Sequence, residues 1–409
     1  MAMSGEQANR DLSVKFAGLT FPNPFILSSA PPTTNGEMIR RAFQAGWGGA
    51  VSKTLNPEGV VIRDVTPRLA TMRDARGAAF ALGNIELTTK RTLGEWVRDF
   101  DALKEEFPDR IIIASLMAET SRQAWQDITR RVQGHVDAVE LNLSCPHGMP
   151  EKGMGMAVGQ DPAITEAVVG WVKEVATVPV LVKLTANVTD LAPIVEAAER
   201  AGADAFVAIN TVSAIMGVDL DTLTPLPAVK GRGTFCGYSG PGIKPIGLRC
   251  VAQIAQVTAR PISAVGGIET WQDAVEYMAV GASTVQLCTA VMFRGYRIVR
   301  RLRSGLSSYL QDKGFAQVED IVGKALGALT AHEELDFDHR VVYRIDEERC
   351  TDCGICITSC RDAGYSAIDR RPDRPQIDPQ RCDGCSLCQQ VCPVEGCVTP
   401  VEETRAATA

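Results

Sequence analysis

Eight of the thirteen cysteines of this 409-residue sequence lie near its carboxyl end, in two runs of identical spacing. Each run reads C-x2-C-x2-C-x3-C, and Pro393 follows the second run. The members are Cys350, Cys353, Cys356 and Cys360, then Cys382, Cys385, Cys388 and Cys392. In bacterial ferredoxins with this spacing, three thiolates of a run bind one 4Fe–4S cluster and the fourth binds the other. The sequence therefore predicts two 4Fe–4S clusters and one-electron transfer.

The crossing of the fourth cysteine gives each cluster ligands from both runs. We expect one cluster on Cys350, Cys353, Cys356 and Cys392, and the other on Cys382, Cys385, Cys388 and Cys360. Zinc also binds C-x2-C pairs, but two complete runs and the Cys-Pro ending favour iron–sulfur clusters. Disulfide frameworks are typical of short secreted chains, so we do not expect disulfide bonds between these cysteines. No role is predicted for the remaining thiols Cys236, Cys250, Cys288 and Cys397.

The residues before Val341 alternate between short apolar runs typical of buried strands and amphipathic stretches typical of helices. Eight strands are expected, over 25–30, 49–54, 111–117, 138–145, 180–187, 205–212, 261–267 and 284–291. Among the helices, one over 38–45 ends at Gly46, and another is capped by Ser121 and ends near Gly134. Eight strand–helix pairs favour an α/β fold of the (β/α)8 TIM barrel type over an open doubly wound sheet.

The cysteine runs and the strand–helix pattern together predict the domain organisation. We expect the (β/α)8 barrel over residues 1–310, a helical linker over 311–340 and a bacterial-type ferredoxin domain over 341–409. The barrel would carry the catalytic site.

Candidate active-site residues stand where the predicted strands end, which is where TIM barrels place their active-site groups. They are Ser29, Lys53, Asn142, Cys145, Lys183, Asn210, Thr211, Gly266, Gly267 and Thr289. Hydroxyl, amide and ammonium groups are unusual choices for packing a core. Ordinary alternatives exist, since Lys53 and Lys183 could extend to solvent and asparagines could cap turns.

The last two strands point to a cofactor that carries a phosphate. Phosphate commonly binds TIM barrels between the loops after strands seven and eight, where this sequence has Gly266-Gly267 and Thr289. The glycines would let backbone N–H groups approach closely, although a plain tight turn is the alternative. Because the clusters carry single electrons, FMN is expected as the converter between one- and two-electron steps. No G-x-G-x-x-G follows a strand, so NADH or NADPH is expected on a partner.

The loop after the fourth strand reads Asn142-Leu143-Ser144-Cys145-Pro146-His147-Gly148-Met149 and continues through further glycines to Gly159. Such composition is typical of a mobile lid over the barrel mouth or of a plain surface loop. A lone cysteine is commonly an inert buried thiol. Cys145 stands at a strand end with amides beside it, which favours a role in chemistry.

At these residues the sequence resembles the dihydropyrimidine dehydrogenase family, from Phe21-Pro22-Asn23-Pro24 to Cys392-Pro393. The resemblance is carried by 142–149, Ala-Ile-Asn-Thr-Val at 208–212, Ser239-Gly240, Ile243-Lys244-Pro245, Gly266-Gly267-Ile268 and the two cysteine runs. In that family electrons pass from a nicotinamide through FAD and iron–sulfur clusters to FMN, which reduces uracil or thymine. The resemblance implies the same reduction for this chain.

The resemblance also implies a role for each residue at the barrel mouth. Cys145 would be the general acid that protonates carbon 5 of the pyrimidine, while the flavin delivers hydride to carbon 6. The pyrimidine would be bound by Asn84, Asn142, Ser144, Asn210 and Thr211, whose amides and hydroxyls match a uracil edge. FMN would be held by Ser29, Lys53, Thr54, Lys183, Gly240, Gly266, Gly267 and Thr289. A lysine beside the flavin can stabilise the negative charge of its reduced form.

Animal-type members carry FAD and nicotinamide domains upstream of the barrel, whereas this barrel is expected to begin almost at once. The resemblance therefore implies the barrel-plus-ferredoxin subunit of a bacterial two-subunit enzyme, with FAD and NAD(P)H on a partner in a hetero-oligomer. Dihydroorotate dehydrogenase is a rival, but that family usually has asparagine in place of His147 and lacks the fused ferredoxin. The other rival is an electron carrier with an inactive barrel, against which Cys145, Asn142 and Asn210 argue.

Composition limits the expected partners and location. The formal net charge is -7 with no dense Lys/Arg run, which argues against nucleic acid as a partner. The polar start lacks the features of a secretory signal, and no apolar run approaches the roughly 18 residues of a membrane span. A soluble cytoplasmic protein is expected.

Overall fold

The structure is a computed structural model that describes residues 10–145, 154–370 and 374–402. It divides into two compact units, Met1–Leu329 and Thr330–Ala409. The division falls inside the predicted linker 311–340. In this segment α10 (Ile298–Lys313) ends, and the 3-10 helices η5 (Val318–Asp320), η6 (Leu326–Ala328) and η7 (His332–Glu334) follow. The helical character of the segment after α10 is therefore 3-10, and the boundaries at 310 and 340 stay predictions.

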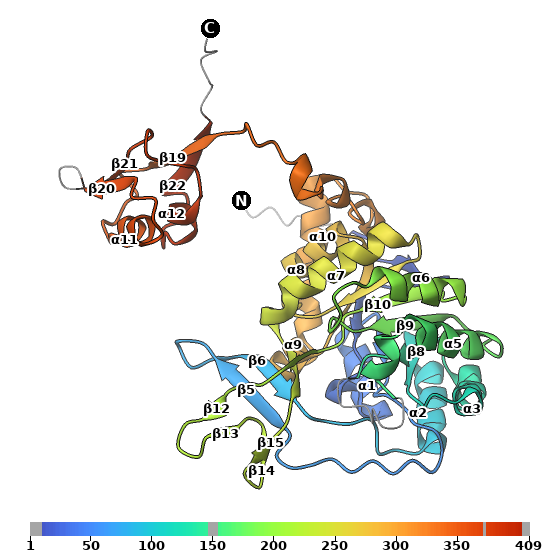
Figure 1. Ribbon diagram of the computed structural model, residues 1–409. Helices are drawn as coiled ribbons and strands as arrows, with labels where there is room; N and C mark the ends of the chain where they lie inside the picture. Colours follow the sequence, from blue (N-terminus) through green and yellow to red (C-terminus); the bar gives the residue numbers. More distant parts are fainter. Residues whose placement is uncertain (1–9, 146–153, 371–373, 403–409) are drawn as a thin grey trace, which may run out of the picture. The chain divides into compact units, whose positions relative to one another are not determined.

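The first unit is built around a closed barrel of eight parallel strands (Figure 1). They are β3 (Phe25–Leu27), β4 (Gly49–Val51), β7 (Ile111–Leu116), β8 (Ala138–Asn142), β9 (Val180–Leu184), β10 (Ala205–Ala208), β17 (Ile262–Val265) and β18 (Ala282–Leu287). Each strand pairs with its neighbour in this order, and β18 closes on β3. The strands are almost entirely buried because they have the barrel interior on one face and helices on the other. The predicted (β/α)8 barrel is confirmed.

Helices alternate with the barrel strands. They are α1 (Gly36–Ala45), α2 (Leu93–Glu106), α3 (Arg122–Val132), α5 (Pro162–Lys173), α6 (Ala192–Arg200), α7 (Lys244–Val257), α8 (Trp271–Ala279) and α10, with the short α4 (Met156–Gly159), α9 (Thr289–Arg294), η1 (Pro31–Thr33), η2 (Gln133–His135) and η4 (Pro241–Ile243). Gly46 ends α1 in the left-handed conformation at φ 112°, and the Ser121 hydroxyl accepts from the backbone N–H of Ala124 at the start of α3. Both of these helix ends are as the sequence predicts.

The strands are shorter than the sequence predicts, and two predicted strands continue into other elements. Residues 205–212 form β10 and then the start of another strand, β11 (Val212–Ala214). The strand predicted over 284–291 is wrong at its end, because β18 stops at Leu287 and Thr289 is the first residue of α9. A continuous apolar run such as 289–293 has no periodicity that separates a strand from a helix.

A four-stranded antiparallel sheet, which the sequence did not predict, accompanies the barrel. Its order is β11, β16 (Cys236–Ser239), β6 (Ala79–Asn84) and β5 (Leu69–Arg73). Small hairpins are formed by β1 (Val14–Phe16) with β2 (Leu19–Phe21), β12 (Val218–Asp219) with β13 (Thr224–Pro225), and β14 (Ala228–Val229) with β15 (Arg232–Gly233). Figure 1 shows β5, β6 and β12–β15 on the same side of the barrel.

The second unit contains both cysteine runs. Two antiparallel pairs frame it, β19 (Val341–Ile345) with β22 (Val398–Glu402) and β20 (Ile368–Arg370) with β21 (Pro375–Ile377). A short helix follows the start of each run, α11 (Ile355–Asp362) and α12 (Leu387–Gln390). Several of the cysteines form the small core of this unit together with Ile345, Ile368 and Val398. Across the described residues of both units, no helix has the length and apolar character needed to cross a membrane.

Candidate active site and cluster-binding thiols

The carboxyl ends of the barrel strands and the four-stranded sheet enclose a cavity of about 1150 Å³, its open mouth included. The predicted site residues that line it are Ser29, Lys53, Thr54, Asn84, Asn142, Cys145, Lys183, Asn210, Thr211, Gly240, Gly266, Gly267 and Thr289. Of the predicted set, Ser144 is absent from the wall but hydrogen-bonds to two residues on it. The structure therefore brings these residues together, while their individual roles stay predictions.

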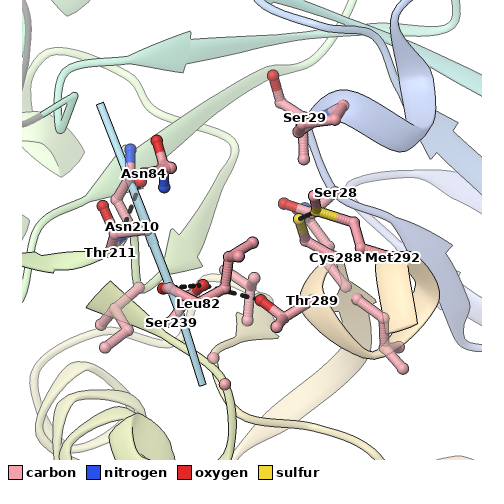
Figure 2. Close-up of a pocket in the computed structure, with 18 of the residues that line it drawn as sticks. Ser28, Ser29, Leu82, Asn84, Asn210, Thr211, Ser239, Cys288, Thr289 and Met292 are labelled. Atoms are coloured by element: carbon pink, nitrogen blue, oxygen red, sulfur yellow. Dashed lines mark hydrogen bonds between the residues drawn. The ribbon is translucent and has the colours of Figure 1, made fainter. Parts of the chain in front are cut away.

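Figure 2 gives the arrangement of the cavity walls. Asn84, Asn210 and Thr211 gather on one side, whereas Ser29 and Cys288 lie on the other. The cavity is therefore polar on both of these sides.

A chain of hydrogen bonds fixes the amides of the cavity. Asn142 Nδ2 donates to Thr54 Oγ1 at 2.9 Å, and Ser144 Oγ donates to Asn142 Oδ1 at 3.3 Å. Asn210 Nδ2 donates to Ser144 Oγ at 2.9 Å and to Asn142 Oδ1 at 3.3 Å. Asn210 Oδ1 accepts from the backbone N–H of Thr211 at 2.8 Å. Because the partners belong to three strand ends, the orientation of each amide depends on the barrel as a whole.

Asn84 reaches the cavity from β6 and not from a turn. It pairs with Leu69 on one side and Gly237 on the other, and its Nδ2 donates to the Gly237 carbonyl at 3.2 Å. The turn-capping alternative is therefore wrong for Asn84.

The two predicted cofactor lysines are buried and ion-paired. Lys53 is 7% exposed, with Nζ 3.0 Å from Glu86 Oε1. Lys183 is 4% exposed, with Nζ 3.3 Å from Glu140 Oε1. The alternative in which these lysines extend to solvent is therefore wrong. Each presents a paired ammonium group to the cavity.

The glycine turn after β17 adopts a conformation that requires glycine. Gly266 and Gly267 have φ of 134° and 73°, and Gly240 beside them has φ of 104°. A Cβ on Gly267 would lie 2.9 Å from the Gly240 carbonyl oxygen. Nearby, Thr289 Oγ1 donates to Ser239 Oγ at 2.8 Å. Backbone N–H groups and hydroxyls without side-chain obstruction suit a phosphate group, so this part of the cavity fits a phosphate-bearing flavin.

The thiols of the second unit line two separate cavities. One contains Cys350, Cys353, Cys356 and Cys392, and the other contains Cys360, Cys382, Cys385 and Cys388. Each cavity thus combines three thiols of one run with the fourth of the other, which fits two 4Fe–4S clusters. Among the described residues, no group of three or more His, Cys, Asp or Glu side chains is arranged to hold a single metal ion. Ligation of iron by these thiols stays a prediction.

Comparison with known proteins assigns both parts of the chain. Residues 11–310 match the dihydroorotate dehydrogenase family, and residues 343–399 match the 4Fe-4S dicluster domain. NAD-dependent dihydropyrimidine dehydrogenase subunit PreA of Escherichia coli K12 is 41% identical over 395 residues, which cover 95% of both chains. The chain belongs to the dihydropyrimidine dehydrogenase family. It is an oxidoreductase with a flavoprotein-type barrel and an iron–sulfur domain, as the sequence resemblance implied.

Two further relatives are named as a dihydropyrimidine dehydrogenase and a dihydroorotate dehydrogenase. Chloroplastic dihydropyrimidine dehydrogenase (NADP+) of Arabidopsis thaliana is 41% identical over 344 residues, 81% of each chain. The catalytic subunit of dihydroorotate dehydrogenase B (NAD+) of Pyrococcus horikoshii is 39% identical over 317 residues, 78% of this chain and 98% of its own. The dihydropyrimidine dehydrogenase fold is thus shared with dihydroorotate dehydrogenases, whereas PreA alone among these three is matched over 95% of this chain.

Several residues of the cavity were missed by sequence reasoning. They are Ser28, Glu86, Ser239, Gln286, Cys288 and Met292 on the wall, and Glu140, which contacts Lys183. Strand alternation contains a signal for Glu140, because it precedes Asn142 by two residues and shares its face of the strand. Glu86 follows an antiparallel strand that was not predicted, so no comparable signal existed for it.

Thiols without a predicted role differ in their surroundings. Cys288 lines the active-site cavity, where burial raises its pKa to about 12, and its Sγ lies 3.8 Å from Met292 Sδ. Cys397 lines the first cluster cavity, and burial together with the nearby thiols Cys392 and Cys350 raises its pKa to about 11. The pKa of both thiols is therefore raised above the ordinary thiol value, chiefly by burial.

The predicted lid lies partly within the described residues. Residues 146–153, which include His147, Gly148 and Gly153, lie outside the described residues, whereas Gly155 and Gly159 are described and buried, the latter at the end of α4.

Proposed function

We propose that this chain reduces uracil or thymine to the 5,6-dihydropyrimidine. The observation that carries the proposal is the single cavity that combines the hydrogen-bonded amides, the Cys145 thiol, two paired lysines and a glycine turn suited to phosphate. The names of two relatives, both dihydropyrimidine dehydrogenases, support the same substrate class.

The amides recognise the pyrimidine edge. An amide offers two donor hydrogens and two acceptor lone pairs, and a uracil ring alternates carbonyl acceptors with N–H donors. Asn84 uses one donor on the Gly237 carbonyl, which leaves capacity for a ligand. Asn142 and Asn210 are anchored to each other through Ser144, so a bound ring meets groups that are already oriented. Thr211 completes the set with its hydroxyl. Preorganised groups of this kind save the ordering that a flexible site would need.

The remainder of the cavity would hold the flavin. Gly240, Gly266, Gly267 and Thr289 would hold its phosphate, and Ser29, Lys53, Thr54 and Lys183, which line the same cavity, would hold its ring. Bound FMN supplies the hydride that adds to carbon 6 of the pyrimidine. Cys145 gives its thiol proton to carbon 5, and the resulting thiolate regains a proton from solvent before the next turnover. One hydride and one proton together saturate the carbon 5–carbon 6 double bond.

Electrons reach the barrel through the second unit and a partner subunit. The crossed thiol sets would hold two 4Fe–4S clusters, which would supply one-electron transfer to a bound FMN. The chain contains no G-x-G-x-x-G after a strand, so FAD and NAD(P)H bind the partner in a hetero-oligomer. The name of the Escherichia coli relative, which calls it a subunit, supports this division of labour.

A dihydroorotate dehydrogenase activity is the second candidate, favoured by the family matched over residues 11–310. The test is a substrate screen of the purified chain with an artificial electron carrier. We expect about eight iron atoms per chain with one FMN, reduction of uracil or thymine, and no oxidation of dihydroorotate. Turnover of dihydroorotate without pyrimidine reduction would contradict the proposal.

The partner requirement has its own test. The isolated chain should not consume NADH or NADPH in the presence of uracil, and addition of an FAD-containing partner should restore consumption. Rapid NADPH oxidation by the pure chain would overturn this part of the proposal.

A further inference from the structure

A fully buried carboxylate lies next to the proposed flavin lysine. Glu140 is 0% exposed and lies on β8 two residues before Asn142. Its Oε1 is 3.3 Å from Lys183 Nζ, and its Oε2 accepts a 3.0 Å hydrogen bond from Gln286 Nε2. Lys183 Nζ also donates to Ser28 Oγ at 3.1 Å. The carboxylate is therefore held between an ammonium and an amide that both line the cavity.

The second cavity lysine has a different charge balance. Lys53 lies 3.0 Å from Glu86 Oε1, but the same oxygen also lies 3.3 Å from Arg68 Nε. Two cations thus share one carboxylate there, and that group keeps a net positive charge. The Lys183–Glu140 pair is neutral. The cavity is therefore charged on the side of Lys53 and compensated on the side of Lys183.

We expect the Lys183–Glu140 pair to affect the electrostatic field in the cavity more than the stability of the fold. The cost of removing two charges from water offsets most of the attraction between them in a buried pair. In contrast, a single uncompensated charge acts over several ångströms where the effective dielectric is low. Glu140 is thus placed to cancel most of the field that Lys183 would otherwise impose on a neighbouring group.

We propose that Glu140 is a positioning residue that holds Lys183 in place and compensates its charge, and so lowers the reduction potential of the bound flavin. The inference rests on the proposed function, because it requires a flavin in the cavity. Without Glu140 the full charge of Lys183 would favour the reduced, more negative flavin. The pair would then make the reduced flavin a stronger donor to the pyrimidine.

The test is the flavin midpoint potential of Glu140→Gln, measured by spectroelectrochemistry on the purified chain. Glutamine keeps the shape of the side chain and removes its charge. We expect at least a tenfold higher ratio of reduced to oxidised flavin at a fixed applied potential, equivalent to about 30 mV for a two-electron couple. An unchanged or lowered potential overturns the proposal.

The double variant Glu140→Gln/Lys183→Met provides a second measurement, because it contains no buried charge at this position. Its potential should be lower than that of Glu140→Gln, and higher than that of Lys183→Met alone, which leaves the carboxylate uncompensated. A merely structural role for Glu140 would lower flavin content or thermal stability without this order of potentials. Where Glu140→Gln alone fails to fold, the other two variants decide the outcome: a potential of the double variant that is no higher than that of Lys183→Met overturns the proposal.

Asp137→Asn is the matched control. Asp137 immediately precedes β8, at the opposite end of the strand from Asn142, and pairs with Lys104. Removal of this carboxylate should leave the flavin potential unchanged, and an equal shift in both variants overturns the specific role of Glu140.

Failure of the proposed function gives a different result from failure of this inference. A purified parent chain that binds no flavin contradicts the proposed function. A Glu140→Gln chain that binds flavin with an unshifted potential contradicts only the role of Glu140.

Discussion

Asn142 Nδ2 donates a 2.9 Å hydrogen bond to Thr54 Oγ1, which joins the end of β8 to the loop after β4. The same oxygen lies 2.9 Å from Ser115 Oγ and 3.1 Å from Ser29 Oγ. Thr54, which follows the second barrel strand β4, therefore connects Ser29 after the first strand, Ser115 of the third and Asn142 of the fourth, and so orients an amide of the site. Its contribution is geometric, because it fixes the direction in which Asn142 faces the cavity.

Thr54→Val should remove these bonds while keeping the shape of the side chain. A buried amide left without its partner costs about 1–3 kcal/mol, so the free energy of unfolding should fall by this order. The KM for uracil should rise more than kcat falls, because the change affects recognition and not proton transfer. Denaturant unfolding and steady-state kinetics measure the two effects. Thr71→Val, at an exposed position of β5, is the control and should change neither quantity.

Sequence reasoning was most successful where a periodic pattern coincided with a strong local signal. All eight barrel strands were located because buried parallel strands read as short apolar runs between helices with clear ends such as Gly46. The polar residues at the strand ends then predicted which side chains share the cavity. Lys53 and Lys183 are examples. The local sequence does not show that their side chains are buried, but their places at strand ends of a barrel put them in the cavity.

The parts that the sequence did not predict depend on long-range pairing. β5 is largely exposed and lacks an alternating pattern, and β16 pairs with β6 across more than a hundred residues. Asn84 consequently could be placed in the cavity only through the resemblance. The carboxylate partner Glu86 was missed for a related reason, because it follows the unpredicted strand β6, whereas Glu140 was missed although its spacing from Asn142 places both residues on one face of β8.

The ion pair between Lys244 and Asp273, beside the glycine turn, should make the stability of the fold depend on pH in the acid range. Burial alone would raise the pKa of Asp273, but hydrogen bonds from Lys244 Nζ and from the backbone of Glu269 and Thr270 outweigh it and hold the pKa below its ordinary value. A carboxylate with a depressed pKa stabilises the folded state above its unfolded pKa, near 4, and this stability is lost as pH falls through the folded pKa.

Asp273→Asn should therefore lower the thermal midpoint at pH 7 and make it less sensitive to pH below about 4. The measurement is the thermal midpoint of parent and variant between about pH 3 and pH 7. Asp312→Asn, an exposed position on α10, should reproduce the parent profile. Parallel pH profiles of the parent and Asp273→Asn would contradict the assignment.

Ligand crossing predicts which cluster suffers when the last cysteine is replaced. Cys392→Ala should damage the cluster held by the first run, because Cys392 lines the cavity of Cys350, Cys353 and Cys356. Iron analysis and electron paramagnetic resonance of the reduced protein should reveal the loss of one cluster signal and retention of the other. Cys397→Ala, in the same cavity, is the control and should keep iron near about eight per chain. Loss of the second-run signal instead would indicate that the runs do not cross.

Cys145 decides whether the cavity performs proton transfer. General acid catalysis is typically worth about 10²–10⁴-fold, so Cys145→Ala should lose pyrimidine reduction by that factor while flavin and iron contents stay near those of the parent. Cys145→Ser should also be slow, because a hydroxyl is a far weaker acid than a thiol of similar shape. Stopped-flow reduction of uracil measures the step directly. Cys250→Ala removes a thiol buried in α7 and should affect stability alone. Turnover by Cys145→Ala within a few-fold of the parent would assign Cys145 the same structural role as Cys250.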